Sequence, residues 1–364
     1  MWVTLLLFAW PISYAEYDKY PPPLGINRPD RWPSGMFVSN TFGRHIESRR
    51  RGMLKYHTVM RKCGSAAILA TCIAAGGAKL AHADITLPVP APTDIIRVEL
   101  HGYEQLDSFY NDLGYTPESW DAGERTIPRL FLQTIPEAWR DDIADQLTVA
   151  AKKRVFFRTL GPLTLLANEE IAFQKKVLKD AISNNDSAVI GELASQYRIT
   201  YDPDDPATIA ELENRIGPVP ASLAMAQMAI ESGWGTSRFA AHGNALFGQW
   251  TYDGEGITPE EQRSHLGDYK IAAFKTPFGS VRAYMMNLNT GSAYKEFRTL
   301  RAKMIAESKP LSGMALAETL TRYSERGEVY VKEVQAVIRQ NKLIQVDEAV
   351  LEDSPYYNLI PAGQ

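Results

Sequence analysis

Cysteine is nearly absent from this sequence of 364 residues, which contains only Cys63 and Cys72. Both lie in a segment that we expect to be removed from the mature chain, so a disulfide framework and a cysteine nucleophile are excluded. The six histidines are scattered, and neither a Cys-x-x-Cys nor a His-Glu-x-x-His pattern occurs. We therefore expect no metal site and no other cofactor.

The sequence also lacks a strong charge imbalance and a long apolar run. Its formal net charge is -4 and no basic stripe runs through it, which argues against a nucleic-acid partner. Residues 64–75 are apolar, but Gly76-Gly77 and Lys79 interrupt the run before it is long enough to span a bilayer. We therefore expect no integral membrane segment in the mature chain.

Residues 53–83 have the pattern of a secretory signal peptide. Lys55, Arg61 and Lys62 give a positive start, residues 64–75 an apolar centre, and Ala81-His-Ala83 a cleavage site. An earlier apolar run could be a signal ending near residue 15, but it has no positive charge in front of it. We therefore expect residues 1–52 to be an upstream extension from a mis-assigned start. The pattern predicts export, cleavage near Ala83 and a periplasmic location.

The rest of the chain is predicted to be mainly α-helical. Three prolines make residues 84–97 an extended linker. Glu169 and Glu170 could be a catalytic pair, but exposed positions on a helix are the simpler interpretation. Residues 347–364 are expected to form a loosely held tail. Apolar spacing predicts helices over 103–113, 139–150, 152–166, 168–183, 187–198, 207–216, 278–289, 294–305, 314–321 and 330–340.

One carboxylate, Glu231, lies in an apolar setting at the end of the best-defined helix. Two prolines precede residues 221–230, a run rich in Ala, Leu and Met that should bury one face. Gly233 and Gly235 end the helix, because glycine readily leaves the right-handed conformation. The negative end of the helix dipole and burial would both raise the pKa of Glu231. A general acid that must hold a proton near neutral pH needs such a pKa.

Two motifs follow one another here, Ala-x-Glu-Ser-Gly-Trp-Gly at residues 229–235 and Asn-x-Leu-Phe-Gly at residues 244–248. At these residues the sequence resembles the family 73 glycoside hydrolases, the peptidoglycan N-acetylglucosaminidases, and above all their Bax-like members. The resemblance covers roughly residues 191–343 and, more weakly, the helical stretch before them. The resemblance implies a lysozyme-like α+β domain with a small β-lobe over 191–346. A helical N-terminal region over 98–190 would precede it, and Glu231 would be the general acid.

A glycosidase usually needs a second group opposite its acid. Relatives commonly supply a glutamate from the β-lobe, and Thr258-Pro-Glu-Glu261 lies at about that place, although Pro259 departs from the pattern. Glu260, Glu261 or Asp268 would then be that group. Alternatively, the 2-acetamido oxygen of the substrate attacks the anomeric carbon, which we place slightly ahead of Glu260. For each acid the competing interpretation is a solvated position on a polar loop.

By the same resemblance Tyr323 would be a further catalytic residue that polarises the acetamido group or orients water. The competing interpretation is that Tyr323 and Tyr330 are packing residues with polar tips. Tyr330 is also a candidate for binding substrate.

The remaining candidates for substrate binding are three aromatic residues and two polar ones. The aromatic rings would line the bottom of the substrate cleft, and the alternative is that they pack in the hydrophobic core. Ser232 would orient Glu231, and Asn244 would hydrogen-bond either the loop or the sugar. These residues are Trp234, Phe247 and Trp250, followed by Ser232 and Asn244.

The sequence therefore predicts a peptidoglycan hydrolase whose partner is the glycan strand. It would be an endo-β-N-acetylglucosaminidase that cuts the β-1,4 bond between N-acetylglucosamine and N-acetylmuramic acid. A muramidase or lytic transglycosylase is a near alternative, since both use a glutamate acid in a lysozyme-like fold. A non-catalytic peptidoglycan-binding module is another, motivated by the imperfect β-lobe match. A scaffold that acts through Asn168-Glu-Glu-Ile171 is a third.

Overall fold

The computed structural model describes residues 94–252, 254–260 and 268–362. The predicted extension, the signal peptide, the linker prolines, Cys63, Cys72 and Glu261 lie outside these residues. All described residues belong to one compact unit. Among them, no helix is long and apolar enough to cross a membrane.

Helices make up most of this unit, in agreement with the predicted fold class, and two small parallel sheets and one antiparallel sheet complete it. The helical elements are α1 (Tyr103–Asp112), α2 (Pro117–Asp121), η1 (Trp139–Ile143), α3 (Ala144–Gln146), α4 (Val149–Ser183), α5 (Ser187–Gln196), α6 (Pro206–Arg215), α7 (Ala221–Glu231), α8 (Arg238–Gly243), α9 (Pro277–Thr290), η3 (Ser292–Tyr294), α10 (Lys295–Ala306), α11 (Gly313–Ala317), α12 (Glu328–Gln340) and η4 (Leu343–Glu348). The strands are β1 (Ile95–Leu100), β2 (Thr126–Ile127), β3 (Leu130–Leu132), β4 (Trp250–Thr251), β5 (Gly256–Ile257), β6 (Lys270–Ala272), β7 (Val350–Leu351) and β8 (Tyr356–Pro361).

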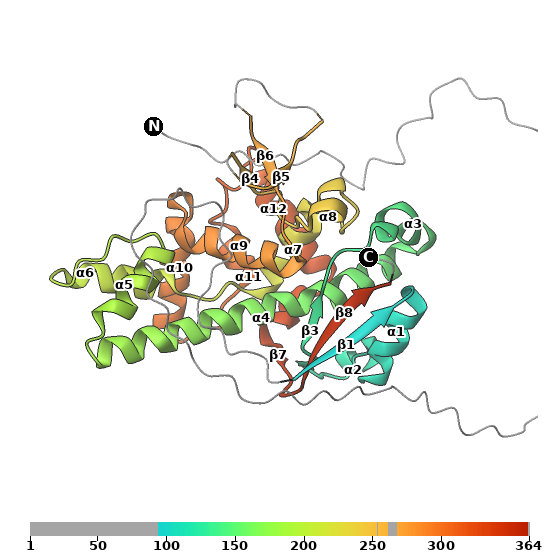
Figure 1. Ribbon diagram of the computed structural model, residues 1–364, viewed down its shortest axis with the longest axis horizontal. Helices are drawn as coiled ribbons and strands as arrows, with labels where there is room; N and C mark the ends of the chain where they lie inside the picture. The colour runs from blue at the N-terminus through green and yellow to red at the C-terminus, as the bar shows by residue number, and fades with distance from the viewer. Residues whose placement is uncertain (1–93, 253, 261–267, 363–364) are drawn as a thin grey trace, which may run out of the picture. The chain divides into compact units, whose positions relative to one another are not determined.

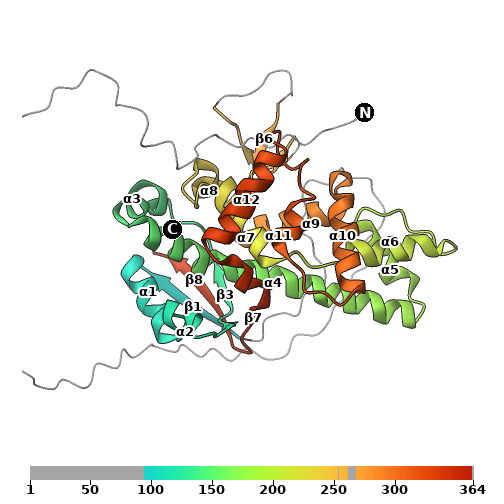
Figure 2. The same ribbon diagram turned by 180° about the vertical axis from the view of Figure 1, so that it is seen from behind.

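Helix α7 is the centre of the unit. Residues 221–229 are all buried, so the helix is covered on every side and not on the single face that its sequence predicted. A helix that is apolar all round belongs in a core. Helices α4, α11 and α12 and the turn η4 pack around it (Figures 1 and 2). A Cβ at Gly161 of α4 would meet the Met225 side chain of α7 at 2.9 Å, so glycine permits this close approach.

Helix α4 is one continuous helix of 35 residues where two were predicted, and it contains Pro162. The adjacent Glu169 and Glu170 of α4 pair with arginines from other parts of the chain. Glu169 pairs with Arg129 at 2.5 Å, and Glu170 pairs with Arg282 of α9 at 2.7 Å. The prediction that both are exposed is wrong for Glu170, whose side chain is only 11% exposed because α9 covers it.

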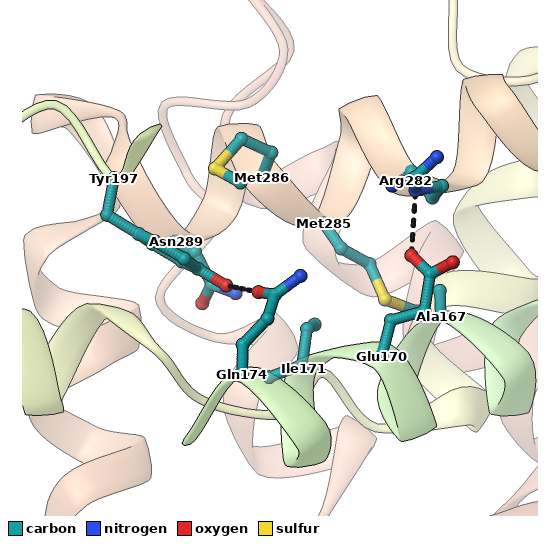
Figure 3. Close-up of a pocket in the computed structure, with 9 residues that line it drawn as sticks. All are labelled: Ala167, Glu170, Ile171, Gln174, Tyr197, Arg282, Met285, Met286 and Asn289. Atoms are coloured by element: carbon teal, nitrogen blue, oxygen red, sulfur yellow. Dashed lines mark hydrogen bonds and ion pairs between the residues drawn. The ribbon is translucent and has the colours of Figure 1, made fainter. Parts of the chain in front are cut away.

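The ion pair between Glu170 and Arg282 lies at one end of a small cavity of about 20 Å³ between α4 and α9, shown in Figure 3. At its other end Gln174 accepts a hydrogen bond from Tyr197. Residues of α4 and of α7 to α12 thus share one hydrophobic core. The predicted N-terminal region and the predicted enzyme domain therefore pack as one body.

The tail is the clearest departure from the sequence-based expectation. Strand β8 is the central strand of a parallel sheet of order β1-β8-β3, with Leu359 fully buried. The expectation of a loose tail is wrong because β8 has a hydrogen-bonded strand on each side. Its partner β1 begins at Ile95, so the predicted linker ends at least three residues earlier than expected. One sheet therefore joins the first and last described segments.

The predicted β-lobe is present as a small antiparallel sheet of order β4-β6-β5. Gly256 is required at its position, because a Cβ there would lie 2.6 Å from the Ile271 carbonyl oxygen. Figure 1 shows this sheet on the opposite side of α7 from α4.

Candidate active site

Glu231 is the last residue of α7, and a hydrogen-bonded turn fixes the backbone beyond it. Gly233, at φ 56°, donates to the Ile230 carbonyl, and Trp234 donates to the Ala229 carbonyl at 2.9 Å. These two bonds make a Schellman motif, which satisfies carbonyls at a helix end. The predicted glycine stop is confirmed at this position. The turn places Glu231 one residue before the chain leaves the helix.

Trp234 adopts a backbone conformation that tryptophan rarely takes, with φ 59°. The left-handed region costs a non-glycine residue roughly 1–2 kcal/mol. Its carbonyl accepts a hydrogen bond from Trp139 Nε1 at 3.0 Å, and its ring packs edge-on against Phe156 and Phe157 of α4. Two such aromatic pairs contribute about 0.5–1.5 kcal/mol each, and a hydrogen bond about 1 kcal/mol, which outweighs the strain.

The contacts of Trp234 place its ring against α4. Lys153 lies over the same ring, with its ammonium nitrogen 4.8 Å from the ring centroid. These contacts agree with the alternative interpretation of Trp234, which is packing within the protein and not stacking on a sugar.

A chain of hydrogen bonds leads from the core to Glu231. Tyr284 of α9 donates to Gln227 Oε1 at 2.6 Å, and Gln227 Nε2 donates to the Tyr330 hydroxyl at 2.8 Å. Tyr330 of α12 donates in turn to Glu231 Oε1 at 2.7 Å. Because Tyr330 already accepts from Gln227, its own proton is directed to Glu231. A proton held by Glu231 is therefore carried by Oε2.

Four buried tyrosines form a cluster beside this carboxyl. The Tyr323 ring stacks on the Tyr330 ring with centroids 5.4 Å apart and planes 6° apart, and it meets Tyr284 and Tyr294 at 6.4 and 6.1 Å. We call Tyr284, Tyr294, Tyr323 and Tyr330 the tyrosine cluster. Burial raises the pKa of each of them, and the charge of Glu231 raises it further. All four therefore stay protonated as hydrogen-bond donors.

Glu231 is tuned to hold its proton near neutrality. Burial raises the pKa of Glu231 to about 7, against smaller lowering effects of the Tyr330 hydrogen bond and the Arg326 charge. Glu333 of α12 adds a small raising effect. Arg326 pairs with Glu333 at 2.5 Å and lies 5.6 Å from the Tyr330 ring centroid. Taken as a whole, the Glu231 residue is partly accessible to solvent, unlike residues 221–229 before it in α7.

Ser232 and Phe247, which were predicted to bind substrate, make contacts within the protein that stabilise the fold. The buried Ser232 hydroxyl donates to the Met228 carbonyl and accepts from the Gly235 amide. Phe247 is fully buried and stacks on Tyr284 at 3.9 Å. Their geometry gives both residues packing and turn-forming roles.

Asn244 bonds the protein's own loops, the first of its two predicted alternatives. Its Oδ1 accepts from the Ile135 amide and the Thr134 hydroxyl, and its Nδ2 donates to the carbonyls of Phe274 and Lys275. The left-handed backbone at Asn244, φ 49°, ends α8. This side chain therefore joins α8 to the segment before η1 and to the end of the β-lobe.

The β-lobe candidates differ from Glu231 in exposure. The Glu260 side chain is 78% exposed and its Oε1 lies 3.5 Å from Arg238 Nε. Asp268 is also exposed. Trp250 is partly exposed, and its ring stacks on Tyr269 with centroids 4.2 Å apart. Of the predicted aromatic floor, Trp250 is the ring that lies in the β-lobe.

The sequence-based selection missed several residues that act on Glu231. Gln227 lies one helical turn before Glu231, and Glu333 lies one turn after Tyr330, so helical spacing could have indicated both. Tyr284 and Arg326 come from other elements and had no local signal, and neither had Trp139, which bonds the Trp234 carbonyl. Among the described residues, no group of three or more His, Cys, Asp or Glu side chains could hold a metal ion.

Residues 207–343 match the sequence profile of a family named Glucosaminidase and described as mannosyl-glycoprotein endo-beta-N-acetylglucosaminidase. The chain is also similar to Protein bax of Escherichia coli strain K12, with 27% identity over 198 residues, which cover 52% of this chain and 70% of that protein. No solved structure was found to match. The matched segment includes Glu231, Tyr323 and Tyr330. Over residues 207–343, the chain is therefore similar to the glucosaminidase family.

Proposed function

We propose that the protein is a peptidoglycan hydrolase, an endo-β-N-acetylglucosaminidase that cuts the β-1,4 bond between N-acetylglucosamine and N-acetylmuramic acid. The observation that carries this proposal is Glu231 at the end of α7, hydrogen-bonded by Tyr330 and partly accessible as a residue, whose pKa of about 7 suits proton donation near neutral pH. The glucosaminidase-family match supports the class of substrate. Peptidoglycan lies outside the inner membrane, which agrees with the export signal predicted at residues 53–83.

Glu231 acts as the general acid. Tyr330 occupies Oε1, so the proton on Oε2 passes to the glycosidic oxygen as the bond from that oxygen to the anomeric carbon breaks. The carboxylate that remains keeps its hydrogen bond from Tyr330. Since Tyr330 stabilises the charged form of Glu231, it also eases the loss of the proton.

The acetamido oxygen of the substrate supplies the second group. It bonds to the anomeric carbon as the leaving oxygen departs and forms a bicyclic oxazolinium ion. Water then attacks that carbon as its bond to the acetamido oxygen breaks, and the attacking water gives a proton to the Glu231 carboxylate, which restores the acid. We favour substrate assistance over a second protein carboxylate because an N-acetylated sugar brings the acetamido oxygen with it, whereas Glu260 is 78% exposed and paired with Arg238. The hydroxyl of Tyr323 would polarise the acetamido group.

The test is the chemistry of the new chain end. Purified protein is incubated with sacculi, and the soluble fragments are reduced with borohydride and analysed by mass spectrometry. We expect reduced N-acetylglucosamine ends. Reducible muramic ends would identify a muramidase, 1,6-anhydro muramic ends a lytic transglycosylase, and binding without release a non-catalytic module. Any of these three results would refute the proposal.

A second measurement tests the assisting group. A thiazoline analogue of the bicyclic ion should inhibit the enzyme competitively, whereas the oxazolinium path is excluded if the analogue has no effect.

A further inference from the structure

The turn that follows Glu231 is held by residues that precede the family segment. Trp139 of η1 donates to the Trp234 carbonyl, and Phe156 and Phe157 of α4 enclose the Trp234 ring, with centroid distances of 5.6 and 5.3 Å. These three residues lie before residue 207, where the family match begins. We call Trp139, Phe156 and Phe157 the aromatic clamp.

The fit between the clamp and the turn is close. Gly235 has φ +79°, and a Cβ there would lie 3.1 Å from Trp139 Nε1 and 3.6 Å from Phe156 Cδ2. The residues just before Trp139 bind the C-terminal part of α8. Thr134 and Ile135 donate hydrogen bonds to Asn244. Glu137 pairs with His242 at 3.0 Å. The segment around η1 therefore fixes the chain at both ends of α8.

The held turn is connected to Glu231 through short hydrogen bonds. Trp234 donates to the Ala229 carbonyl, and Gly235 donates to Ser232 Oγ, which itself bonds the Met228 carbonyl. A shift of the Trp234 carbonyl must therefore move the last turn of α7, which carries Glu231. Proton donation needs the carboxyl in place, and a displacement on the order of 1 Å can lower a rate by about a hundredfold.

We propose that Trp139 is a positioning residue for Glu231: with Phe156 and Phe157 it holds the turn at residues 233–235, so that the N-terminal helices form part of the catalytic apparatus. The catalytic part of this inference rests on the proposed function. The structural part, that the clamp sets the surroundings of the Glu231 carboxyl, can be tested without turnover.

The first experiment measures the ionisation of Glu231 in Trp139→Phe, which keeps an aromatic ring but removes the Nε1 donor. Glutamate labelled at the side-chain carboxyl carbon is followed by NMR against pH, and Glu231→Gln assigns the signal. Among the described residues, the charged or titratable groups that interact with Glu231 are unchanged in this variant, namely Tyr330, Arg326, Glu333, Tyr284, Tyr294 and Tyr323.

A released turn would admit water to the carboxyl, so we expect the midpoint to fall from about 7 toward the ordinary glutamate range. Trp120→Phe is the matched control, because Trp120 Nε1 makes an equivalent hydrogen bond to Gln345. It should leave the midpoint unchanged. An unchanged midpoint in folded Trp139→Phe, or the same shift in Trp120→Phe, would overturn the proposal.

The second experiment measures the release of fragments from sacculi. We expect Trp139→Phe to lower kcat about tenfold or more with little change in KM, and the alkaline limb of the rate profile to move to lower pH. A purely structural role would lower activity only in proportion to the unfolded fraction measured by circular dichroism, and would leave that limb in place. Such a result would refute the proposal.

Phe157→Leu keeps the inference testable if Trp139→Phe fails to fold. It loosens the Trp234 ring while the hydrogen bond from Trp139 remains, so it should shift the midpoint in the same direction by less. No shift in this variant would count against the clamp. If the wild type cuts no glycan, the proposed function fails, whereas the NMR titration still decides whether the clamp controls Glu231.

Discussion

The end of α7 and the β-lobe hold their acidic residues in opposite ways. Burial beside the tyrosine cluster raises the pKa of Glu231 to about 7, although the hydrogen bond from Tyr330 lowers it in part. Glu260 has a side chain that is 78% exposed and one ion pair with Arg238. Desolvation can tune a carboxyl only where water is excluded. The comparison shows that the fold buries the carboxyl at the end of α7 and leaves the Glu260 carboxyl of the β-lobe in solvent.

The largest expected difference between the two regions is in turnover. Glu231→Gln should lower kcat by about 10²–10⁴-fold, since a positioned general acid contributes that much. Glu260→Gln should change kcat by less than about fivefold, because exposed ion pairs contribute at most about 1 kcal/mol. Release of muropeptides from sacculi measures both. An equal loss in the two variants would assign a catalytic carboxylate to the β-lobe and contradict substrate assistance.

Within the tyrosine cluster, Tyr330→Phe and Tyr323→Phe should separate two roles. Tyr330→Phe removes the donor that stabilises the Glu231 carboxylate, so kcat should fall about tenfold and the pKa of Glu231 should rise, moving the alkaline limb upward.

Tyr323→Phe should lower kcat while that limb stays in place, if its hydroxyl acts on the acetamido group. The rate profile against pH checks both variants. If the alkaline limb moved in Tyr323→Phe as it does in Tyr330→Phe, the hydroxyl of Tyr323 would act through Glu231 as well.

Stability should also distinguish the regions. Because its folded-state pKa lies above the ordinary 4.5, Glu231 favours folding fully below about pH 4.5, and this contribution is lost as the pH rises through about 7. Glu231→Gln cannot ionise, so its stability relative to the wild type should rise from pH 4 to pH 8 by up to ~3 kcal/mol.

Urea unfolding at the two pH values measures this change, with Glu260→Gln as the exposed control. A constant difference between Glu231→Gln and the wild type would show that Glu231 has an ordinary pKa.

The smallest expected effect concerns the pair of charges on the far side of Tyr330. Glu333→Gln removes a group that raises the pKa of Glu231, and Arg326→Met removes one that lowers it. The alkaline limb should therefore move down in the first variant and up in the second. Each change in rate near neutral pH should stay within about threefold, because these side chains are partly solvated. Shifts of the same sign would contradict this arrangement.

The sequence predicted the site in part. The glycine stop after Glu231, the apolar helix before it and the β-lobe followed from local patterns, and each is present. The roles of Trp234 and Ser232 could not be derived in the same way. A tryptophan such as Trp234 can stack on a sugar ring. Its ring instead contacts Phe156 and Phe157, which lie more than 70 residues earlier in the sequence. Aromatic residues pack on proteins and on sugars by the same physics, so only the neighbour decides between them.

The fold shows the same division. Helices α4 to α12 were largely predicted because their apolar spacing is local. Strand β8 was missed because six residues of a parallel strand acquire their meaning from β1 and β3, which lie more than 220 residues away. A parallel strand carries no hairpin signal that links it to its partners.

Sequence alone determined that one carboxylate would end an alanine-rich helix at a glycine turn, because helix propensity and glycine freedom act over a few neighbouring residues. Tertiary structure alone decided that this carboxylate would be protonated near neutral pH. The segments that bury the carboxyl come together only on folding, as do Tyr330 from α12 and Arg326 from the preceding turn, which lower the pKa of Glu231 by less than burial raises it. Burial by distant segments sets the local dielectric, and the dielectric sets the charge that Glu231 carries.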